Sequence, residues 1–435
     1  MAGRSETTTI QFSLVTSHFS YCTFGYIMID SIVMSNQNTL LPPEPLNRTI
    51  VWQVAILALC RLVINTARRF AYPFAPVLSR GLGVPLTAVT SIIAMNQGTA
   101  LLGVIVGPLA DRMGYRRMMM TGMGMLAVGM LLGGFLPFYW AVFISLVIAG
   151  LGKIIFDPAA QAYIGDHVPY HHRSRIVGFL EMSWAGCTLA GIPLIGILIR
   201  YFNWHAPFLA MGGLGLIGFS AITVALPPDR PVHGSGSGFS TLVKSWHSLA
   251  HQRPALGAIG VAFFVSIAND NLFVVYGAWL EQSFQLSPVA IGLSTIAIGI
   301  AELKGEVLTA FFSDRIGLKR AVLGGIVLST LSYGMLPLVG NNLVSALIIL
   351  FLIFLFFEYM VVSFMALSTE LIPEARATMM AGVYASGGMG RIIGALMGIP
   401  VWQWGGIQAT AGVSVLISTM GLISLAWGLK KGREI

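Results

Sequence analysis

The chain has 435 residues, of which 56% are hydrophobic and only 10% are charged, and its mean hydropathy is +0.80. Soluble domains carry about 25% charged residues, so this composition excludes a soluble globular protein and indicates one whose solvent is lipid. The net charge of +8 is explained better by basic cytoplasmic loops than by contact with nucleic acid. The three cysteines lie far apart and form no disulfide or metal-binding pattern.

Residues 1–49 are expected to form an N-terminal tail on the cytoplasmic side of the membrane. Residues 1–33 are rich in Thr and Ser, and no basic segment precedes a clean apolar core, so a signal peptide is not predicted. We expect residues 1–33 to be disordered, or to be an over-extended gene start with Met34 as the initiator.

From Ile50 onward, apolar segments of about 20 residues recur, each long enough to cross about 30 Å of hydrocarbon. The short alternating segments of a strand barrel are absent from the sequence. The predicted fold is therefore all-α and integral to the membrane. Twelve spans are predicted, near residues 51–79, 86–109, 117–136, 139–164, 176–199, 207–226, 255–281, 289–311, 321–338, 343–369, 379–400 and 408–429.

The distribution of Lys and Arg predicts the orientation. With the N-terminus inside, nearly all basic turns fall on one side, and the opposite side holds only Arg80 and Arg200. Because cytoplasmic loops carry the excess of Lys and Arg, we predict that both termini are cytoplasmic in a multi-pass protein of the cell membrane.

The connection 227–254 has the composition of a flexible linker, with two prolines followed by Gly234-Ser-Gly-Ser-Gly238. It separates a predicted N-terminal six-helix bundle, 50–226, from a predicted C-terminal six-helix bundle, 255–429. Residues 430–435 are then a second cytoplasmic tail.

A charged turn occurs twice at an offset of 203 residues. It reads GPLADRMGYRR at 107–117 and FSDRIGLKR at 312–320. A second motif, DHVP at 166–169, is repeated as ELIP at 370–373, with an offset of 204. Two motifs repeated at nearly one offset indicate two homologous membrane halves.

With these motifs the chain resembles the major facilitator superfamily over about residues 50–430. The first charged turn is similar to the superfamily signature G-x-L-x-D-R-x-G-R-R, with Pro108 before the Leu and Tyr115 between Gly114 and Arg116. The resemblance implies two six-helix bundles related by a pseudo-two-fold axis. It also implies a secondary transporter of small molecules with neither enzyme activity nor a cofactor.

The resemblance further implies a cytoplasmic gating network, in which opposite charges hold the outward-open state and separate when the halves rock. The alternative is that its arginines only set the topology. The matching positions are Asp111, Arg112, Gly114, Arg116 and Asp166, with Asp314, Arg315, Arg320 and Glu370 as the second-half copies.

Span five is similar to the glycine and proline motif of drug–proton antiporters in this superfamily. The motif positions are Gly186, Gly191, Pro193 and Gly196, although an Ile separates Gly191 from Pro193. They imply a kinked helix that packs closely at the interface of the bundles, whereas the alternative is ordinary small-residue packing. Span four lacks the arginine of the antiporter motif R-x-x-Q-G. Because this arginine is absent, proton coupling would depend on a different pair of residues.

Ionisable side chains inside the spans are the candidate functional residues, because charge is costly in hydrocarbon. Arg61, Asn65, Arg68 and Tyr72 follow at steps of four, three and four, and so they share one helical face. By analogy with the superfamily, spans one, four, seven and ten line the cavity. The predicted substrate-cavity residues are Arg61, Asn65, Lys153, Asp157, Asp270 and Glu358.

Glu302 and Glu306 lie one helical turn apart. Two carboxylates this close in a low dielectric favour keeping a proton near neutral pH, which proton coupling requires. The proton-coupling candidates are Glu302, Glu306, Glu358 and Arg391. The alternative is that these charges form static ion pairs.

The leading hypothesis is a transporter that moves a small organic solute by alternating access, with protons as the coupling ion and efflux as the direction. The alternative is a nutrient or metabolite symporter or uniporter of the same fold.

The sequence has no G-x-x-x-x-G-K-[ST] loop for ATP. Three histidines near Asp166 (His167, His171 and His172) are more simply solvated loop residues than metal ligands, so no metal site is predicted. A monomer is expected by analogy with the superfamily.

Overall fold

The computed structural model describes residues 47–103, 113–229, 251–340, 342–372 and 376–429. In these ranges every regular element is helical, as predicted. The described residues from Trp52 onward belong to one compact unit.

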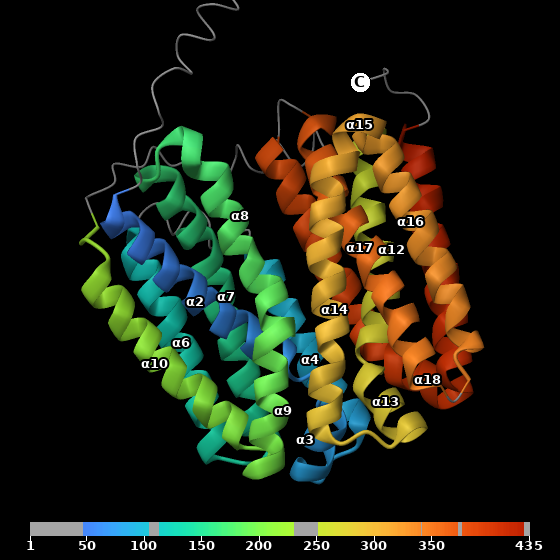
Figure 1. Cartoon of the computed structure of the whole chain (residues 1–435), viewed down its shortest axis with the longest axis horizontal. Coiled ribbons are helices and arrows are strands. Elements are labelled where there is room, and N and C mark those ends of the chain that lie inside the picture. Colours follow the sequence, from blue (N-terminus) through green and yellow to red (C-terminus); the bar gives the residue numbers. More distant parts are fainter. Residues whose placement is uncertain (1–46, 104–112, 230–250, 341, 373–375, 430–435) are drawn as a thin grey trace, which may run out of the picture. The chain divides into compact units, whose positions relative to one another are not determined.

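The helices of the first half of the chain are shown in blue to light green in Figure 1. They are α2 (Arg48–Arg69), α3 (Ala75–Leu82), α4 (Leu86–Gly98), the 3-10 turn η1 (Thr99–Leu102), α6 (Tyr115–Phe135), α7 (Tyr139–His167), α8 (Tyr170–Gly186), the π-helical turn η2 (Cys187–Gly191), α9 (Ile192–Tyr201) and α10 (Ala206–Ala225).

The helices of the second half are shown in yellow to red in Figure 1. They are α12 (Arg253–Phe273), α13 (Tyr276–Phe284), α14 (Pro288–Leu308), the π-helical turn η3 (Thr309–Ser313), α15 (Asp314–Ile316), α16 (Leu318–Met335), the 3-10 turn η4 (Leu336–Leu338), α17 (Leu343–Leu371) and α18 (Arg376–Leu429).

Among the described residues, nine helical segments are long and apolar enough to cross a membrane. The number becomes ten if α3 and the segment from Leu86 to Leu102, which meet at 117°, count as one broken span. The longest of the nine, Thr378–Leu429, contains a break at Gly405 and Gly406, where Gly406 has a φ of 62° that favours glycine. Twelve spans therefore remain a prediction.

The structure corrects one predicted span. The segment 51–79 is not one helix, because α2 ends at Arg69 and α3 begins at Ala75. Pro73 lies in the break, and proline lacks an N–H and disfavours helical geometry in the preceding residue. The segment 255–281 also contains two helices, because α12 ends at Phe273 and α13 begins at Tyr276, but Arg253–Phe284 still counts as one span.

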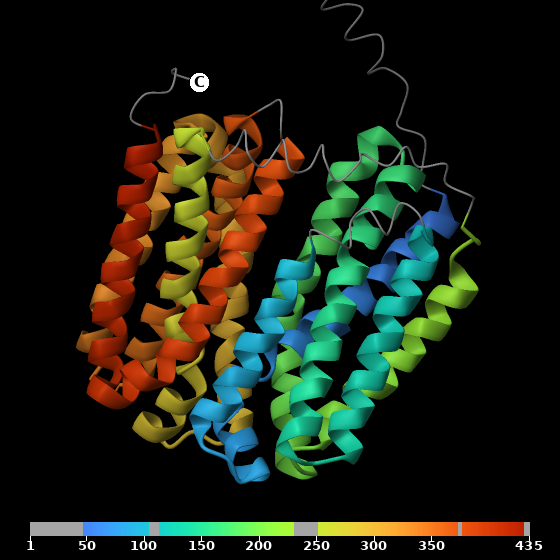
Figure 2. The ribbon, with the colours of Figure 1, turned by 180° about the vertical axis from the view of Figure 1, so that it is seen from behind.

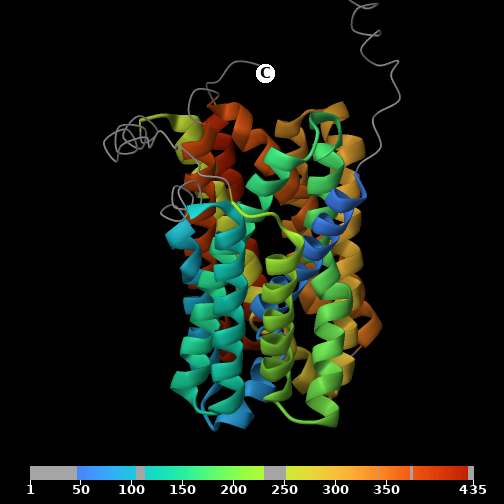
Figure 3. The ribbon, with the colours of Figure 1, turned by 90° about the vertical axis from the view of Figure 1, so that its left-hand side faces the viewer.

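Small residues let the helices pack at short distances. In the first half, α6 lies between α7 and α10 (Figure 3). A Cβ atom built on Gly122 of α6 would lie 2.6 Å from the carbonyl oxygen of Gly152 in α7, so no larger residue fits there. Such backbone contact is typical of helices that pack in a membrane, where van der Waals contact drives association.

The two halves touch along two seams, which can be followed in Figures 1 and 2. In one seam α9 and η2 pack on α14, and in the other α4 and η1 pack on α18. A Cβ built on Gly196 would lie 2.7 Å from the carbonyl oxygen of Pro288, and Pro193 lies against Gly292 of α14. The other two positions of the predicted packing motif, Gly186 and Gly191, face Leu62 and Thr66 of α2.

Candidate functional site

Four charged side chains from α2, α7 and α8 form what we name the first-half charge cluster: Arg61, Lys153, Asp157 and Glu181. Arg61 Nε lies 3.2 Å from Asp157 Oδ1, and Arg61 Nη1 lies 2.8 Å from Glu181 Oε1. Lys153 Nζ lies 2.6 Å from the other oxygen of Asp157 and donates at 2.5 Å to Asn65 Oδ1. The structure thus brings together four of the six predicted cavity residues.

The carboxylates of this cluster are the more accessible members. The side chains of Asp157 and Glu181 are 21% and 41% exposed, whereas Arg61 and Lys153 are buried. Tyr384 of α18 is exposed and lies within electrostatic range of Arg61, Asp157 and Glu181. The accessible carboxylates of Asp157 and Glu181 in the first half therefore lie near the hydroxyl group of Tyr384 in the second half.

A buried ion pair between Arg69 and Glu302, named here the seam ion pair, joins the halves. Arg69 Nη2 lies 2.7 Å from Glu302 Oε1, and Nη1 donates to Oε2 at 3.2 Å. Thr188 Oγ donates to the same Oε2 at 2.9 Å and accepts from Arg69 Nη1, also at 2.9 Å. The Arg69 guanidinium also lies over the rings of Trp184 and Phe273, at 4.5 and 5.3 Å. Glu302, predicted as a coupling residue, thus has a fully satisfied carboxylate.

A second set of contacts between the halves is a directional chain of hydrogen bonds. Arg68 donates to Gln97 Oε1 at 2.6 Å, Gln97 Nε2 donates to the Tyr72 hydroxyl at 2.8 Å, and Tyr72 donates to Asp270 Oδ1 at 2.6 Å. Arg391 of α18 lies at the far end, with its Nε 4.0 Å from Asp270 Oδ2. The predicted cavity residue Asp270 is therefore held by groups from both halves.

Glu306 of α14 and Glu358 of α17 differ from the other acids. Within the described ranges neither accepts a hydrogen bond or forms an ion pair, and both are partly buried. A Cβ built on Gly305 would lie 2.8 Å from Glu358 Cβ, so the two helices touch beside these carboxylates. Glu302 acts electrostatically on both of them, and Glu306 also acts on Glu358. We name these two residues the unpaired carboxylates.

The predicted gating network is only partly covered by the structure. Asp111 and Arg112 and the side chain of Asp314 lie outside the described residues. Asp166 is exposed, and its carboxylate lies 3.7 Å from His167 Nδ1. The remaining positions, Arg315, Arg320 and Glu370, are exposed at helix ends. The network therefore stays a prediction.

Asp229 lies beside Gly114 and Arg116 at the start of α6. Its two oxygens accept the backbone N–H groups of Arg116 at 2.8 Å and Arg117 at 3.0 Å, and so they cap the start of α6. The Arg116 guanidinium donates to the carbonyl oxygen of Thr223 at 2.5 Å. Asp229 lies 113 residues beyond Arg116, and no local sequence signal links the two.

We expect Asp229→Ala to lower the free energy of unfolding by about 1 kcal/mol, the usual effect of losing a helix cap. Gly114→Ala should cost more, because Gly114 has a φ of 90° and the new Cβ would lie 2.3 Å from Asp229 Cγ. Thermal unfolding of the purified variants measures both effects.

The double variant Gly114→Ala/Asp229→Ala separates the steric clash with Asp229 from the backbone strain at residue 114. If the clash is real, Gly114→Ala will cost less in the Asp229→Ala background, where only the backbone strain remains. Equal costs in both backgrounds would contradict this geometry, and Asp229→Asn, which keeps one acceptor oxygen, is the matched control.

No three His, Cys, Asp or Glu side chains of the described ranges gather as ligands for a metal ion. Residues that the sequence analysis did not single out but that the site uses are Thr188, Gln97 and Asp229. Uncharged or extramembrane side chains such as these carry no sequence signal of their own.

Comparison with known proteins agrees with this architecture. The family model described as Major Facilitator Superfamily matches residues 57–268 and 258–434. The uncharacterized MFS-type transporter YceJ of Bacillus subtilis is 25% identical over 251 residues, which cover 58% of this chain and 63% of the relative.

Two further relatives are named for drug resistance. The class G tetracycline resistance protein of Vibrio anguillarum is 26% identical over 246 residues, covering 55% of this chain and 61% of the relative. The chloramphenicol resistance protein CraA of Acinetobacter baumannii is 22% identical over 289 residues, covering 65% and 68%. Since the family model matches both halves, the chain belongs to the major facilitator superfamily of multi-pass membrane transporters, which are not enzymes.

Proposed function

We propose that this protein is a secondary active transporter that exports a small organic solute in exchange for protons, by alternating access. It would act as a monomer in the cell membrane, with both termini in the cytoplasm. The observation that carries the proposal is that Glu306 and Glu358 form no direct ion pair and accept no hydrogen bond among the described residues, although Arg69 and Arg391 act electrostatically on Glu358. The names of the tetracycline and chloramphenicol resistance relatives support efflux as the direction.

Four other acids inside the described spans each face a cation. Asp157 and Glu181 contact Arg61, Glu302 contacts Arg69, and Asp270 faces Arg391. The close contacts of Asp157, Glu181 and Glu302 favour ionised carboxylates, so these three acids have little reason to change protonation during transport. A carboxylate without a partner in a low dielectric is costly, so it favours a bound proton or a cationic ligand.

In the proposed cycle, Glu358 and Glu306 bind a proton from one side of the membrane and release it when solute arrives from the other. The solute would lie between the accessible face of the first-half charge cluster and Tyr384. Asp157 and Glu181 offer acceptors there, and Tyr384 offers a ring and a hydroxyl. Glu181 acts electrostatically on Glu306, so a solute bound beside Glu181 would change how tightly the unpaired carboxylates hold a proton and would couple the two fluxes.

The test uses purified protein in liposomes that contain a pH-sensitive dye. A pH gradient is imposed, and a panel of cationic drugs, organic anions and sugars is added to parent, Glu358→Gln and Glu306→Gln. We expect proton flux that depends on solute in the parent and falls to the level of empty liposomes in Glu358→Gln. Glu281→Gln is the control, because Glu281 pairs with Arg80 at a helix end, away from the unpaired carboxylates.

A second measurement separates coupling from binding. Exchange of labelled for unlabelled solute needs no net proton movement, so it should survive in Glu358→Gln. Solute movement without proton flux in the parent would instead indicate a uniporter or another coupling ion. Inward solute movement together with protons would indicate a symporter.

A further inference from the structure

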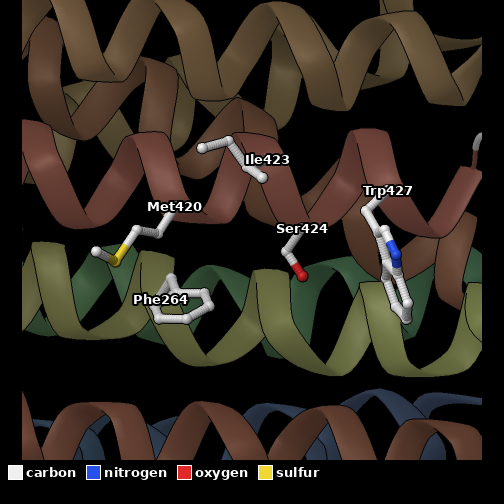
Figure 4. Close-up of a pocket in the computed structure, with 5 residues that line it drawn as sticks. All are labelled: Phe264, Met420, Ile423, Ser424 and Trp427. Carbon is white, nitrogen blue, oxygen red and sulfur yellow. The ribbon is translucent and has the colours of Figure 1, made fainter.

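We propose that a groove on the outer surface of α12 and α18 binds an acyl chain of an anionic phospholipid, whose phosphate contacts Arg253. The groove, shown in Figure 4, has a volume of about 340 Å³. Its lining residues are Phe264, Met420, Ile423, Ser424 and Trp427. The inference does not depend on what the protein transports.

The groove exists because small residues of α12 and α18 face each other. A Cβ built on Gly257 of α12 would lie 2.6 Å from the Cα of Gly428, so the backbones almost touch. Gly260 also lacks a side chain, and a Cβ there would lie 2.1 Å from Ser424 Oγ. Ser424 donates its hydroxyl to the carbonyl oxygen of Gly257 at 3.0 Å, which leaves the groove with apolar surface.

The groove is open to the surroundings of the protein. Met420, Ile423 and Trp427 are 41%, 62% and 46% exposed, although they surround a concave surface. In a membrane protein such a surface is covered by lipid or by another apolar partner. Even a shallow apolar groove contacts a chain over more of its surface than a convex helix face does.

Arg253 places a positive charge at one end of the groove. It is the first residue of α12, it is exposed, and its guanidinium lies 5.9 Å from the Trp427 ring centroid. The described residues offer it neither a hydrogen-bond acceptor nor an ion-pair partner. Its donors can therefore bind a phosphate, which guanidinium groups recognise in a bidentate manner.

The distance from Arg253 to the far end of the groove also fits a lipid. Phe264 lies eleven residues beyond Arg253, which corresponds to about 16 Å along the helix. This places a cation and a tryptophan at the level where headgroups lie, with apolar surface continuing towards the bilayer centre. A basic residue at such a position attracts anionic lipids electrostatically. An apolar peptide or a second copy of the chain would not require the cation at the end.

Native mass spectrometry of the purified full chain tests the proposal. Phosphatidylglycerol and phosphatidylcholine with identical acyl chains are added in equal amounts, and the first bound lipid is counted. We expect the parent to prefer phosphatidylglycerol about fivefold, the effect of one basic residue near the membrane surface. Arg253→Gln should abolish the preference, whereas Arg200→Gln, at the exposed end of α9, should leave it unchanged.

A second pair of variants tests the groove itself. Met420→Trp fills it and should lower binding of both lipids, whereas Met335→Trp is a control of the same residue type with 40% exposure at the end of α16. Unchanged lipid preference in Arg253→Gln, or unchanged lipid binding in Met420→Trp, would overturn the proposal. So would a dimer of the parent that dissociates in Met420→Trp, because a second copy would then occupy the groove.

Discussion

Replacing Glu302 with Gln is expected to lower the free energy of unfolding by about 3–5 kcal/mol, the usual cost of breaking a buried ion pair by removing one partner. The Arg69 guanidinium would stay buried with a neutral neighbour, since Arg69 and Glu302 are only 4% and 2% exposed. Thr188 cannot compensate, because a hydroxyl carries no charge. Thermal or denaturant unfolding of the purified protein measures the effect.

An exposed pair provides the matched control. Arg80 and Glu281 also lie 2.7 Å apart and also join the two halves, but the Arg80 side chain is 60% exposed. Exposed pairs contribute about 0–1 kcal/mol, so Glu281→Gln should change stability little. Equal losses in Glu302→Gln and Glu281→Gln would show that the burial of the seam ion pair does not matter.

The double variant Arg69→Met/Glu302→Met should recover most of the lost stability. It removes both charges together, and replacement of a buried ion pair by apolar residues is often neutral or stabilising. Met also keeps a flexible side chain against Trp184 and Phe273. If the double variant is no more stable than Glu302→Gln, the loss comes from packing rather than from the unpaired charge.

Asp157→Asn should have the second large effect on stability, about 2–3 kcal/mol. Asp157 is the shared acceptor of Arg61 and Lys153, so its neutralisation leaves two buried cations with weaker partners. We place the loss below the range for a fully buried pair because Asp157 is 21% exposed and partly screened by solvent. The same unfolding measurement applies.

The geometry predicts that only one second substitution restores stability. Arg61 keeps Glu181 at 2.8 Å, whereas Lys153 would keep only the neutral oxygen of Asn65. Lys153→Met should therefore rescue Asp157→Asn, and Arg61→Met should not. Equal rescue by both substitutions would mean that only the total charge of the first-half charge cluster affects stability. The individual contacts of Arg61 and Lys153 would then not matter.

Several features of the protein follow from the sequence by itself. The membrane environment follows from composition, because hydropathy is a sum over residues that no fold can change. The steps of four, three and four between Arg61, Asn65, Arg68 and Tyr72 predicted one helical face. Arg61, Asn65 and Arg68 do lie on α2 and contact other helices, whereas Tyr72 lies beyond the end of α2. Helical spacing fixes which side chains share a face before any tertiary contact forms.

The span boundaries could be predicted only roughly. The apolar character of 51–79 continues through Pro73, so hydropathy predicts one helix where the backbone breaks into two. Similarly, a residue such as Asp229 has no local pattern that would identify it as the cap of α6. A cap supplied from another part of the chain depends on where the loop returns.

The partners of the charges were decided by the tertiary structure alone. Glu302 and Arg69 both lie inside predicted spans, but 233 residues separate them, and nothing in the sequence pairs them. In the folded chain Arg391 faces Asp270 instead, and Glu306 and Glu358 have no partner among the described residues. Periodicity determines which way a charge points from its own helix, whereas pairing depends on which helices pack together and at what depth.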